Sequence, residues 1–332
     1  MITFIVVAQP GIYEMQAAIC VATLRKNQPN DEIIAILPTG HGRLHESTIR
    51  LFNHLSIKVV SVTNNLSPKY LIGNKVLGMT VQVNGIRKIM LDSDLISLTS
   101  LTLEDFDAYN VAATPIPPFT YISEDTWRSI LSFYQLDFPE FFYYYNANFV
   151  TCPANSNFPD YWWATVGRLH TALHQRCFSL RPTHPYSREL DQIALGMAGL
   201  ERGDITPLPP YSYPEQDWYR WYERKNRPHN SRLVNHIINY PQYFYWFDNG
   251  LLCTRPLPRL VAITSGMTYF PERQGTPMWR YPRIQEQTMI YYPEISKKIT
   301  EAVMRHPYIT YHPEWNNYQA YYLGQHCPGV LL

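Results

Sequence analysis

The first hundred residues alternate between short apolar runs and segments in which apolar residues recur at helical spacing. Continuous apolar runs are typical of strands that are buried on both faces of a sheet. The predicted strands are Ile2–Ala8, Ile33–Leu37, Ile57–Val62 and Ile86–Leu91, and the predicted helices between them are Met15–Lys26, Leu44–His54 and Asn74–Gln82. This alternation predicts an α/β fold with a Rossmann-like, mostly parallel sheet flanked by helices. Such sheets bind ligands at the carboxyl ends of their strands.

The alternation weakens after Asp105. The pattern there predicts strands over Val111–Pro115 and Tyr143–Pro153, and helices over Glu124–Tyr134, Tyr161–His174 and Arg188–Ala198. From Pro207 onward the chain is dense in Pro, Tyr and Trp, and the pattern assigns no elements with any clarity. We therefore expect an irregular, aromatic- and proline-rich C-terminal half.

Composition narrows the class of protein. The chain has 332 residues, of which 45% are hydrophobic and 17% charged, as in a globular protein. A net charge of +1 gives no strong attraction to nucleic acid or to an anionic membrane, and no apolar run is long enough to span a bilayer. The apolar start MITFIVVAQPG is interpreted as a first strand and not as a signal peptide. Five scattered cysteines favour free thiols in a reducing compartment. We expect a cytoplasmic protein, with peripheral attachment to a membrane left open.

Aromatic residues make up 14% of the chain and include 26 Tyr. Tyrosine and tryptophan offer a flat apolar face with a polar group, which suits sugar rings. The plainer alternative is an irregular core that uses aromatics for packing. The block Glu215–Asn230, EQDWYRWYERKNRPHN, mixes aromatic and basic residues and could bind an acceptor glycan, a single nucleic-acid strand or an acidic membrane edge, or could be ordinary surface packing. We prefer an acceptor platform, because the near-neutral net charge argues against nucleic acid.

Two aspartates interrupt the apolar segment Ile86–Ser100. Asp92 and Asp94 follow a predicted strand directly, and because alternate side chains of a strand share a face they should point the same way. Two neighbouring carboxylates repel and are costly to bury, whereas a divalent cation resolves both problems. Oxygen ligands suit Mg²⁺ or Mn²⁺, which in turn hold phosphate oxygens. The alternative is a strand-end pair that caps loop amides and faces solvent.

A second Asp-x-Asp, Asp105 and Asp107, provides an internal comparison. No apolar strand precedes this pair, so we expect a solvated turn or the start of a helix. The sequence context therefore distinguishes Asp92 and Asp94 as the candidate metal ligands.

Several segments together resemble the GT-A nucleotide-sugar glycosyltransferases, especially the glycogenin and galactinol synthase-like family. The segments occur in the family's order within residues 2–200: ITFIVVA with VATLRKNQP, GNKVLGM, IMLDSDLI, YNANFV and DQIALGMA. The resemblance implies a GT-A type fold. It also implies a metal-dependent enzyme that moves a sugar from a nucleoside diphosphate donor, most simply a UDP-sugar, to a hydroxyl acceptor. YNANFV and the Asp-Gln pair favour retention of the anomeric configuration.

The resemblance also implies roles for individual residues. Asp92 and Asp94 would hold Mn²⁺ or Mg²⁺. The remaining implied contacts are Ala8 at the nucleotide, Asn74 and Lys75 at the phosphates or donor sugar, Asn146 and Asn148 along the donor sugar, and Asp191 and Gln192 near the reacting carbon. The alternatives are a solvated surface position for Lys75 and a simple favourable charge at a helix N-terminus for Asp191.

The chain departs from the family pattern in two places. Asn148 stands where the family usually has glycine, and the late His-x-Gly-x-x-Lys element that supplies a third metal ligand is absent. His236 is the nearest replacement ligand, although a histidine beside apolar residues is more often part of a core. Arg227 and Arg232 are weak replacements for the missing lysine.

The expected organisation has three parts: a nucleotide-sugar-binding half over residues 1–110, a donor-sugar and acceptor half over 111–250, and an extension over 251–332. Two rival functions stay open. One is a non-catalytic protein that binds nucleotide sugars or glycans on the same fold, which the missing His/Lys element favours. The other is a metal-dependent phosphoesterase built on Asp92 and Asp94.

Overall fold

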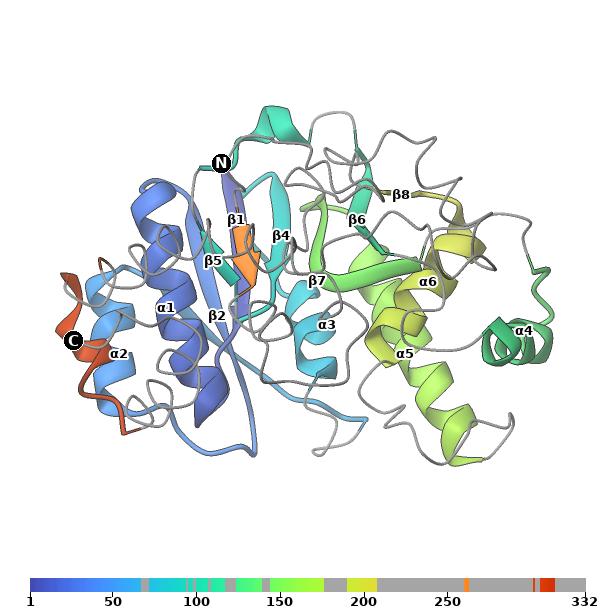
Figure 1. Cartoon of the computed structure of the whole chain (residues 1–332), viewed down its shortest axis with the longest axis horizontal. Helices are drawn as coiled ribbons and strands as arrows, with labels where there is room; N and C mark the ends of the chain where they lie inside the picture. The colour runs from blue at the N-terminus through green and yellow to red at the C-terminus, as the bar shows by residue number, and fades with distance from the viewer. Residues whose placement is uncertain are drawn as a thin grey trace, which may run out of the picture.

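The computed structural model of the chain is shown in Figure 1. It describes residues 1–66, 72–93, 95–97, 100–106, 109–116, 124–138, 144–175, 190–207, 260–262, 301 and 305–313.

A seven-stranded sheet forms the centre of the fold, with the order β3-β2-β1-β4-β7-β6-β8. Its strands are β1 (Ile2–Val7), β2 (Glu32–Pro38), β3 (Lys58–Val62), β4 (Arg87–Leu91), β6 (Val111–Ile116), β7 (Tyr144–Pro153) and β8 (Ile205–Pro207). The first four strands are parallel, β7 runs antiparallel to both β4 and β6, and β8 is parallel to β6. The expectation of an α/β fold with a mostly parallel sheet is confirmed.

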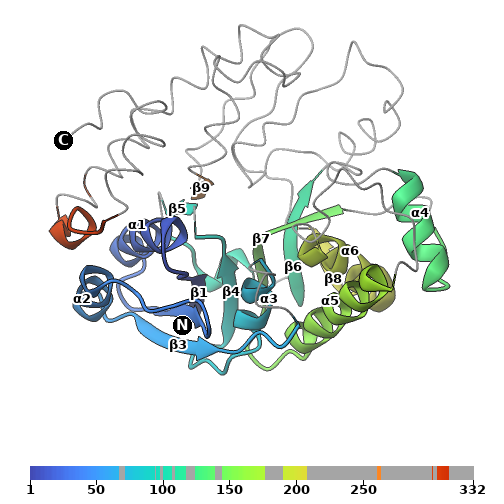
Figure 2. The same cartoon turned by 90° about the horizontal axis from the view of Figure 1, so that it is seen from below.

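Helices cover the sheet on both sides. They are α1 (Ile12–Asn27), α2 (Glu46–His54), α3 (Gly73–Met79), α4 (Glu124–Phe133), α5 (Phe158–His174) and α6 (Leu190–Arg202). Helix α1 packs on β1, β2 and α2, whereas α3 packs on β1, β2 and β4 together with α5 and α6. Figure 2 shows α1 and α2 beside the β1–β3 half of the sheet and α5 and α6 beside the β6–β8 half.

The close seat of α3 on the sheet depends on a glycine. A Cβ atom at Gly78 would lie 2.9 Å from Ile36 Cγ1 and 3.4 Å from Ile5 Cγ2. Ile5, Ile34 and Ile36 belong to the buried cluster that also includes Val76 and Met79 of α3. The absence of a side chain at Gly78 therefore sets how closely the helix approaches β1 and β2.

The predicted elements within the described ranges are all present, but one ends early. The third helix was expected to reach Gln82 and ends at Met79. Lys88 Nζ donates to the carbonyls of Met79 at 3.0 Å and Val81 at 2.7 Å, and Thr80 Oγ1 donates to Leu77 O at 2.8 Å. These side chains satisfy carbonyls that a longer helix would have used. Asp105 forms a capping box with Thr102 in a short 3₁₀ helix, η1 (Leu103–Asp105), which agrees with the turn or helix start expected for this pair at Asp105. Asp107 lies outside the described residues.

The pattern did not predict a second, two-stranded sheet. β5 (Leu95–Ser97) pairs antiparallel with β9 (Leu260–Ala262), so that Leu95 lies opposite Ala262. Ser97 is attached to α1, because its amide donates to Thr23 Oγ1 at 3.1 Å and its carbonyl accepts from Asn27 Nδ2 at 3.0 Å. Figure 1 shows the short pair in front of the main sheet. A segment late in the chain thus reaches the strand that follows Asp92.

The segment 305–313, with η4 (Pro307–Ile309), packs on α1 and α2. His312 Nε2 lies 3.4 Å from Glu14 Oε1, and both side chains are buried. The ring centroid of His306 lies 5.6 Å from that of His54. These contacts fix a late segment of the chain on the helices that follow β1 and β2.

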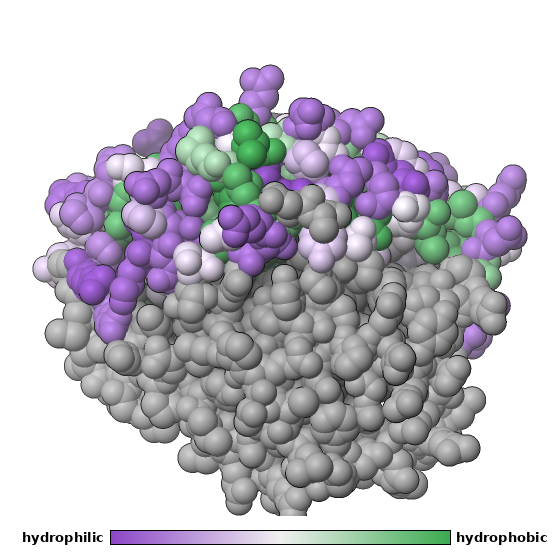
Figure 3. All heavy atoms as spheres, turned by 90° about the horizontal axis from the view of Figure 1, so that it is seen from above, coloured by the Kyte–Doolittle hydropathy of each residue, from purple (hydrophilic) through white to green (hydrophobic). Residues whose placement is uncertain are grey.

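One face of the described part is mostly polar. In Figure 3 hydrophilic residues cover most of the described portion of one face, around a smaller hydrophobic group. Among the residues that the structure describes, no helix combines the length and apolar content needed to cross a membrane.

Candidate functional site

The candidate site lies where the order of the strands in the sheet reverses. Helices after β1 and β2 lead outward to β3, and the chain then returns to place β4 on the other side of β1. Val6 pairs with Leu91, so the ends of β1 and β4 leave the sheet together. Asp92 follows β4 directly, and its amide donates to Asn148 O of β7 at 2.9 Å. Crevices at such a reversal are the usual ligand sites of α/β sheets.

Lys75 connects two carboxylates at this edge. Its Nζ lies 3.1 Å from Asp92 Oδ1 and 2.9 Å from Asp191 Oδ2. The second contact has the distance of an ion pair but not the angle of a hydrogen bond. The side chain of Lys75 is 10% exposed, that of Asp191 0% and that of Asp92 29%. The alternative of a solvated surface lysine is wrong, because α3 and α6 enclose the ammonium.

The charges in this cluster depend on one another. Burial alone disfavours the ammonium of Lys75, but the carboxylates of Asp191 and Asp92 outweigh it and raise the pKa of Lys75. Burial raises the pKa of Asp191, and the ammonium of Lys75 opposes that rise. Desolvation and opposite charge therefore act against each other across a 2.9 Å contact. Either charge becomes costly when its partner is absent.

A row of amide side chains positions the start of α3. Asn64 Nδ2 donates to Asn74 Oδ1 at 2.9 Å, and Asn74 Nδ2 donates to Gln9 Oε1. Asn74 is fully buried, and Gln9 is 7% exposed at the end of β1. Asn74, expected at the donor, therefore holds β1 and the segment after β3 together beside Lys75. Sequence analysis missed Gln9, although its place directly after the first strand was a usable signal.

Asn148 brings an unpartnered amide to the same edge. The residue is 2% exposed, and neither Nδ2 nor Oδ1 of its side chain finds a hydrogen-bond partner within the described part of the chain. Asn146 Oδ1 accepts from Asn148 N at 3.0 Å, which shapes β7 at this point. A buried amide without partners is costly and is commonly completed by a bound group or water.

Helix α6 delivers Asp191 in its first turn, as the sequence pattern predicted. Trp162 Nε1 of α5 donates to Asp191 O at 2.8 Å, and both residues are fully buried. Gln192 is 8% exposed. Trp162 was not among the predicted residues, because nothing in the local sequence indicates that α5 supports this carbonyl.

The structure brings together only part of the expected site. Asp92, Lys75 and Asp191 are in contact, and Asn148 adjoins Asp92 through the backbone. Ala8 is buried, and its amide donates to Ile36 O at 2.9 Å. Asp94, His236, Arg227, Arg232, Asp107 and the block Glu215–Asn230 lie outside the described residues. In the ranges that are described, no group of three or more His, Cys, Asp or Glu side chains could hold a metal ion.

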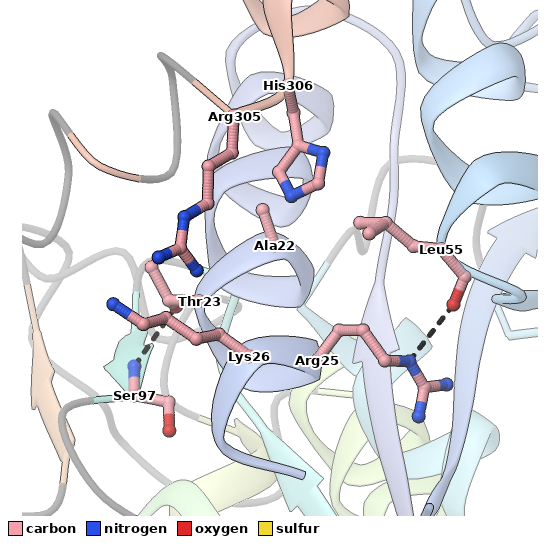
Figure 4. A pocket seen from close by; sticks show the side chains of 8 residues that line it. All are labelled: Ala22, Thr23, Arg25, Lys26, Leu55, Ser97, Arg305 and His306. Atoms are coloured by element: carbon pink, nitrogen blue, oxygen red, sulfur yellow. Dashed lines mark hydrogen bonds between the residues drawn. The ribbon is translucent and has the colours of Figure 1, made fainter. Parts of the chain in front are cut away.

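A separate cavity of about 200 Å³ lies along the C-terminal half of α1. Figure 4 shows Arg305 and His306 on one side of it and Lys26 and Arg25 on another. The basic groups are largely engaged, since Lys26 pairs with Glu301 and Arg25 donates to carbonyls such as Leu55 O at 3.0 Å. None of the predicted site residues lines this cavity, so we do not assign it to the reaction.

One protein family and two solved structures are similar to this chain. The family model described as the Rhodobacterales glycosyltransferase domain matches residues 4–203. The structure is similar to that of the galactosyltransferase LgtC in complex with donor and acceptor sugar analogs, with 12% identity, a TM-score of 0.45, and 68% of this chain and 80% of that chain covered. It is similar to apo mouse xyloside xylosyltransferase 1, with 12% identity, a TM-score of 0.40, and 68% and 90% covered. No curated protein is a significant match.

Proposed function

This chain belongs to the Rhodobacterales glycosyltransferase domain family and is a sugar-transferring enzyme, and on that premise we propose a GT-A type, metal-dependent transferase that uses a nucleoside diphosphate sugar. The donor is most simply a UDP-sugar, and the acceptor is a hydroxyl group. The observation that carries the proposal is the ammonium of Lys75 between Asp92 and Asp191 at the carboxyl edge of the sheet.

The charge of the cluster favours a cation at Asp92. Two carboxylates and one ammonium leave an excess of negative charge, which would repel a diphosphate. Asp92 Oδ1 contacts Lys75, and the Asp92 side chain is 29% exposed. An exposed carboxylate oxygen at a strand end fits Mg²⁺ or Mn²⁺. Asp92 and Asp94 would hold the ion, and when bound it would neutralise charge on the leaving diphosphate.

The remaining residues are assigned by their place. Lys75 would bind a diphosphate oxygen, because it is a fixed positive charge beside Asp92 where negative charge develops. Asn148 would accept from and donate to donor sugar hydroxyls, which satisfies its buried amide. Asp191 would face the reacting carbon, with its backbone fixed by Trp162. We propose retention of the anomeric configuration, which the resemblance of Tyr145–Val150 and of Asp191 with Gln192 to the family's segments supports.

The proposal is tested with a panel of UDP-, GDP- and CDP-sugars and Mn²⁺, by following the release of nucleoside diphosphate and the anomeric proton of the product by NMR. We expect turnover with a UDP-sugar that requires the metal. Asp92→Asn should lower kcat by at least ~100-fold. Asp105→Asn, in the other Asp-x-Asp, is the matched control and should leave kcat within about twofold, as expected of a surface change away from the site.

Two outcomes would contradict this function. If the rate of turnover is unchanged both in Asp92→Asn and after a chelator removes the metal, the reaction does not depend on a metal. Tight binding of UDP with Mn²⁺ in calorimetry, without transfer of any sugar to any acceptor, would instead support the non-catalytic binding protein.

A further inference from the structure

Two lysines connect α3 and β4 in opposite directions. Lys75 of α3 reaches Asp92 at the end of β4, with 3.1 Å between Nζ and Oδ1. Lys88 of β4 reaches back to the other end of α3, where Nζ lies 3.0 Å from Met79 O and 2.7 Å from Val81 O. The helix that carries Lys75 is therefore attached to β4 at both of its ends.

Core packing does not account for Lys88. Lys88 is 5% exposed, and the next two residues of the same strand, Ile89 and Met90, are fully buried and apolar. Burial lowers the pKa of Lys88, and Cys152 and Asp160 oppose that effect only in part. An apolar side chain of similar length would avoid this desolvation penalty. What a lysine adds is a pair of charge-assisted hydrogen bonds to the carbonyls at the end of α3.

Besides the two lysines, α3 is held by its packing on the sheet, α5 and α6, and by the amide side chains at its beginning. Gly78 sets how close the helix lies to Ile36 and Ile5, and Asn74 bonds to Gln9 and Asn64 at its beginning. Apolar contacts define a distance from the sheet but little direction along it, whereas the two hydrogen bonds of Lys88 define both.

We propose that Lys88 is a positioning residue for sugar transfer, which fixes the ammonium of Lys75 against Asp92 and Asp191 by holding the end of α3 to β4. The inference rests on the proposed function, because the place of Lys75 affects the rate only if Lys75 and Asp92 serve the donor. A displacement of about 1 Å in such a group can lower a rate ~100-fold. The loss falls on kcat more than on KM, because the charge that Lys75 would meet grows in the transition state.

Arg87 provides a matched control. It precedes Lys88, is 7% exposed, and donates to Thr151 Oγ1 and to Phe106 O, each at 3.1 Å, and to Tyr109 O. Successive residues of a strand point to opposite faces, so Arg87 supports the side of β4 away from α3. Arg87→Met thus removes an equally buried cation bonded to carbonyls without touching the helix that carries Lys75.

The experiment compares steady-state kinetics of Lys88→Met, Lys88→Arg and Arg87→Met, per folded protein as measured by near-UV circular dichroism. We expect Lys88→Met to lower kcat at least about tenfold while the donor KM changes less than about threefold. Arg87→Met should keep kcat within about threefold, and Lys88→Arg should recover much of the lost rate because it restores charged donors. Equal losses in Lys88→Met and Arg87→Met, or no loss in Lys88→Met, would overturn the inference.

Hydrogen exchange separates this inference from the proposed function. Lys88→Met should speed exchange of the amides in Gly73–Met79 by about tenfold or more, since the helix loses its attachment, while Arg87→Met leaves them unchanged. If the wild-type protein turns over no donor, the proposed function is wrong, but the attachment of α3 by Lys88 can still be tested by exchange. If the exchange rates of these amides are unchanged in Lys88→Met, the proposed positioning role of Lys88 is wrong even if the enzyme is active.

Discussion

The Lys75 ammonium lies 2.9 Å from a carboxylate oxygen of Asp191, and the Asp191 side chain is 0% exposed. The two residues come from α3 and α6, which pack against each other on one side of the sheet. A buried charge pair of this kind stabilises little as a whole, yet each member depends strongly on the other. The same contact therefore affects both the stability of the fold and the chemistry of the site.

Lys75→Met should lower the free energy of unfolding by about 3–5 kcal/mol, because Asp191 is left buried without its cation. Urea unfolding at pH 7 measures the change. Lys58→Met is the control, since the Lys58 side chain is 51% exposed and 3.9 Å from Glu32, and its effect should stay within about 0.5 kcal/mol. Equal effects of the two substitutions would contradict the buried pair.

Lys75 also determines how the stability of the protein depends on pH in the alkaline range. Because Asp191 and Asp92 raise the pKa of Lys75 despite its burial, the stability that it contributes is complete below the unfolded pKa of about 10.4. That contribution is lost only as pH rises through the higher folded pKa. The stability difference between wild type and Lys75→Met should therefore not narrow below about pH 10 and should narrow only above it.

Glu14 should show the opposite dependence, on acid. Burial alone would raise its pKa, but the interactions with His312, Thr48 and the backbone amide of His45 outweigh it and lower the pKa of Glu14. Its stabilising contribution is then present above the unfolded pKa of about 4.3 and is lost as pH falls through the lower folded value. Urea unfolding of Glu14→Gln should give a deficit at pH 7 that disappears at about pH 3. A deficit that persists there would show that the charge of Glu14 is not the cause.

Much of the fold could be predicted from the sequence because its strands and helices are locally encoded. β1 to β4 and the helices between them follow from runs of apolar residues and helical spacing. β5 could not be predicted, because three residues carry no periodicity and their partner, Leu260–Ala262, is far along the chain. The early end of α3 could not be predicted from the sequence either, because it depends on the contacts of Lys88 in the next strand.

The candidate site was predictable to a similar degree. Asp92, Lys75 and Asp191 were expected from the resemblance, and the family match confirms a glycosyltransferase. Gln9 and Trp162 were not expected, because their roles consist of supporting other residues across the fold. Such contacts appear only when strands and helices are placed in space.

Gly78→Ala should lower the free energy of unfolding by about 1–3 kcal/mol, because the new Cβ would lie within 2.9 Å of Ile36 Cγ1. Gly167→Ala is the matched control inside α5, where the nearest atom, Leu66 Cδ2, is 3.6 Å away. That substitution should instead stabilise by about 0.5–1 kcal/mol through helix propensity. Thermal unfolding measures whether Gly78→Ala destabilises the protein and Gly167→Ala stabilises it. If Gly78→Ala also stabilises the protein, α3 has room to move away from Ile36.

Asn148→Leu should separate stability from activity. Removing a buried amide that has no partner in the described structure should raise the free energy of unfolding by about 1 kcal/mol, while transfer is lost with the contacts to the donor sugar. Asn74→Leu, which removes an amide with two partners, should instead cost about 1–3 kcal/mol. Urea unfolding and donor turnover are measured on both, and an active Asn148→Leu would exclude the amide from donor binding.

The pairing of β5 with β9 also bears on how the protein is made. A ribosome has to synthesise Leu260 before the strand after Asp92 can gain its partner, long after β1 and β4 have left the exit tunnel. Closing so long a loop is slow and entropically costly. In pulsed hydrogen exchange during refolding of the full chain, we expect the amides of β9 to become protected after those of β1 and β4. The edge of the sheet that carries Asp92 would thus be the last to mature, so an incompletely synthesised chain would have its central sheet before it had a working site.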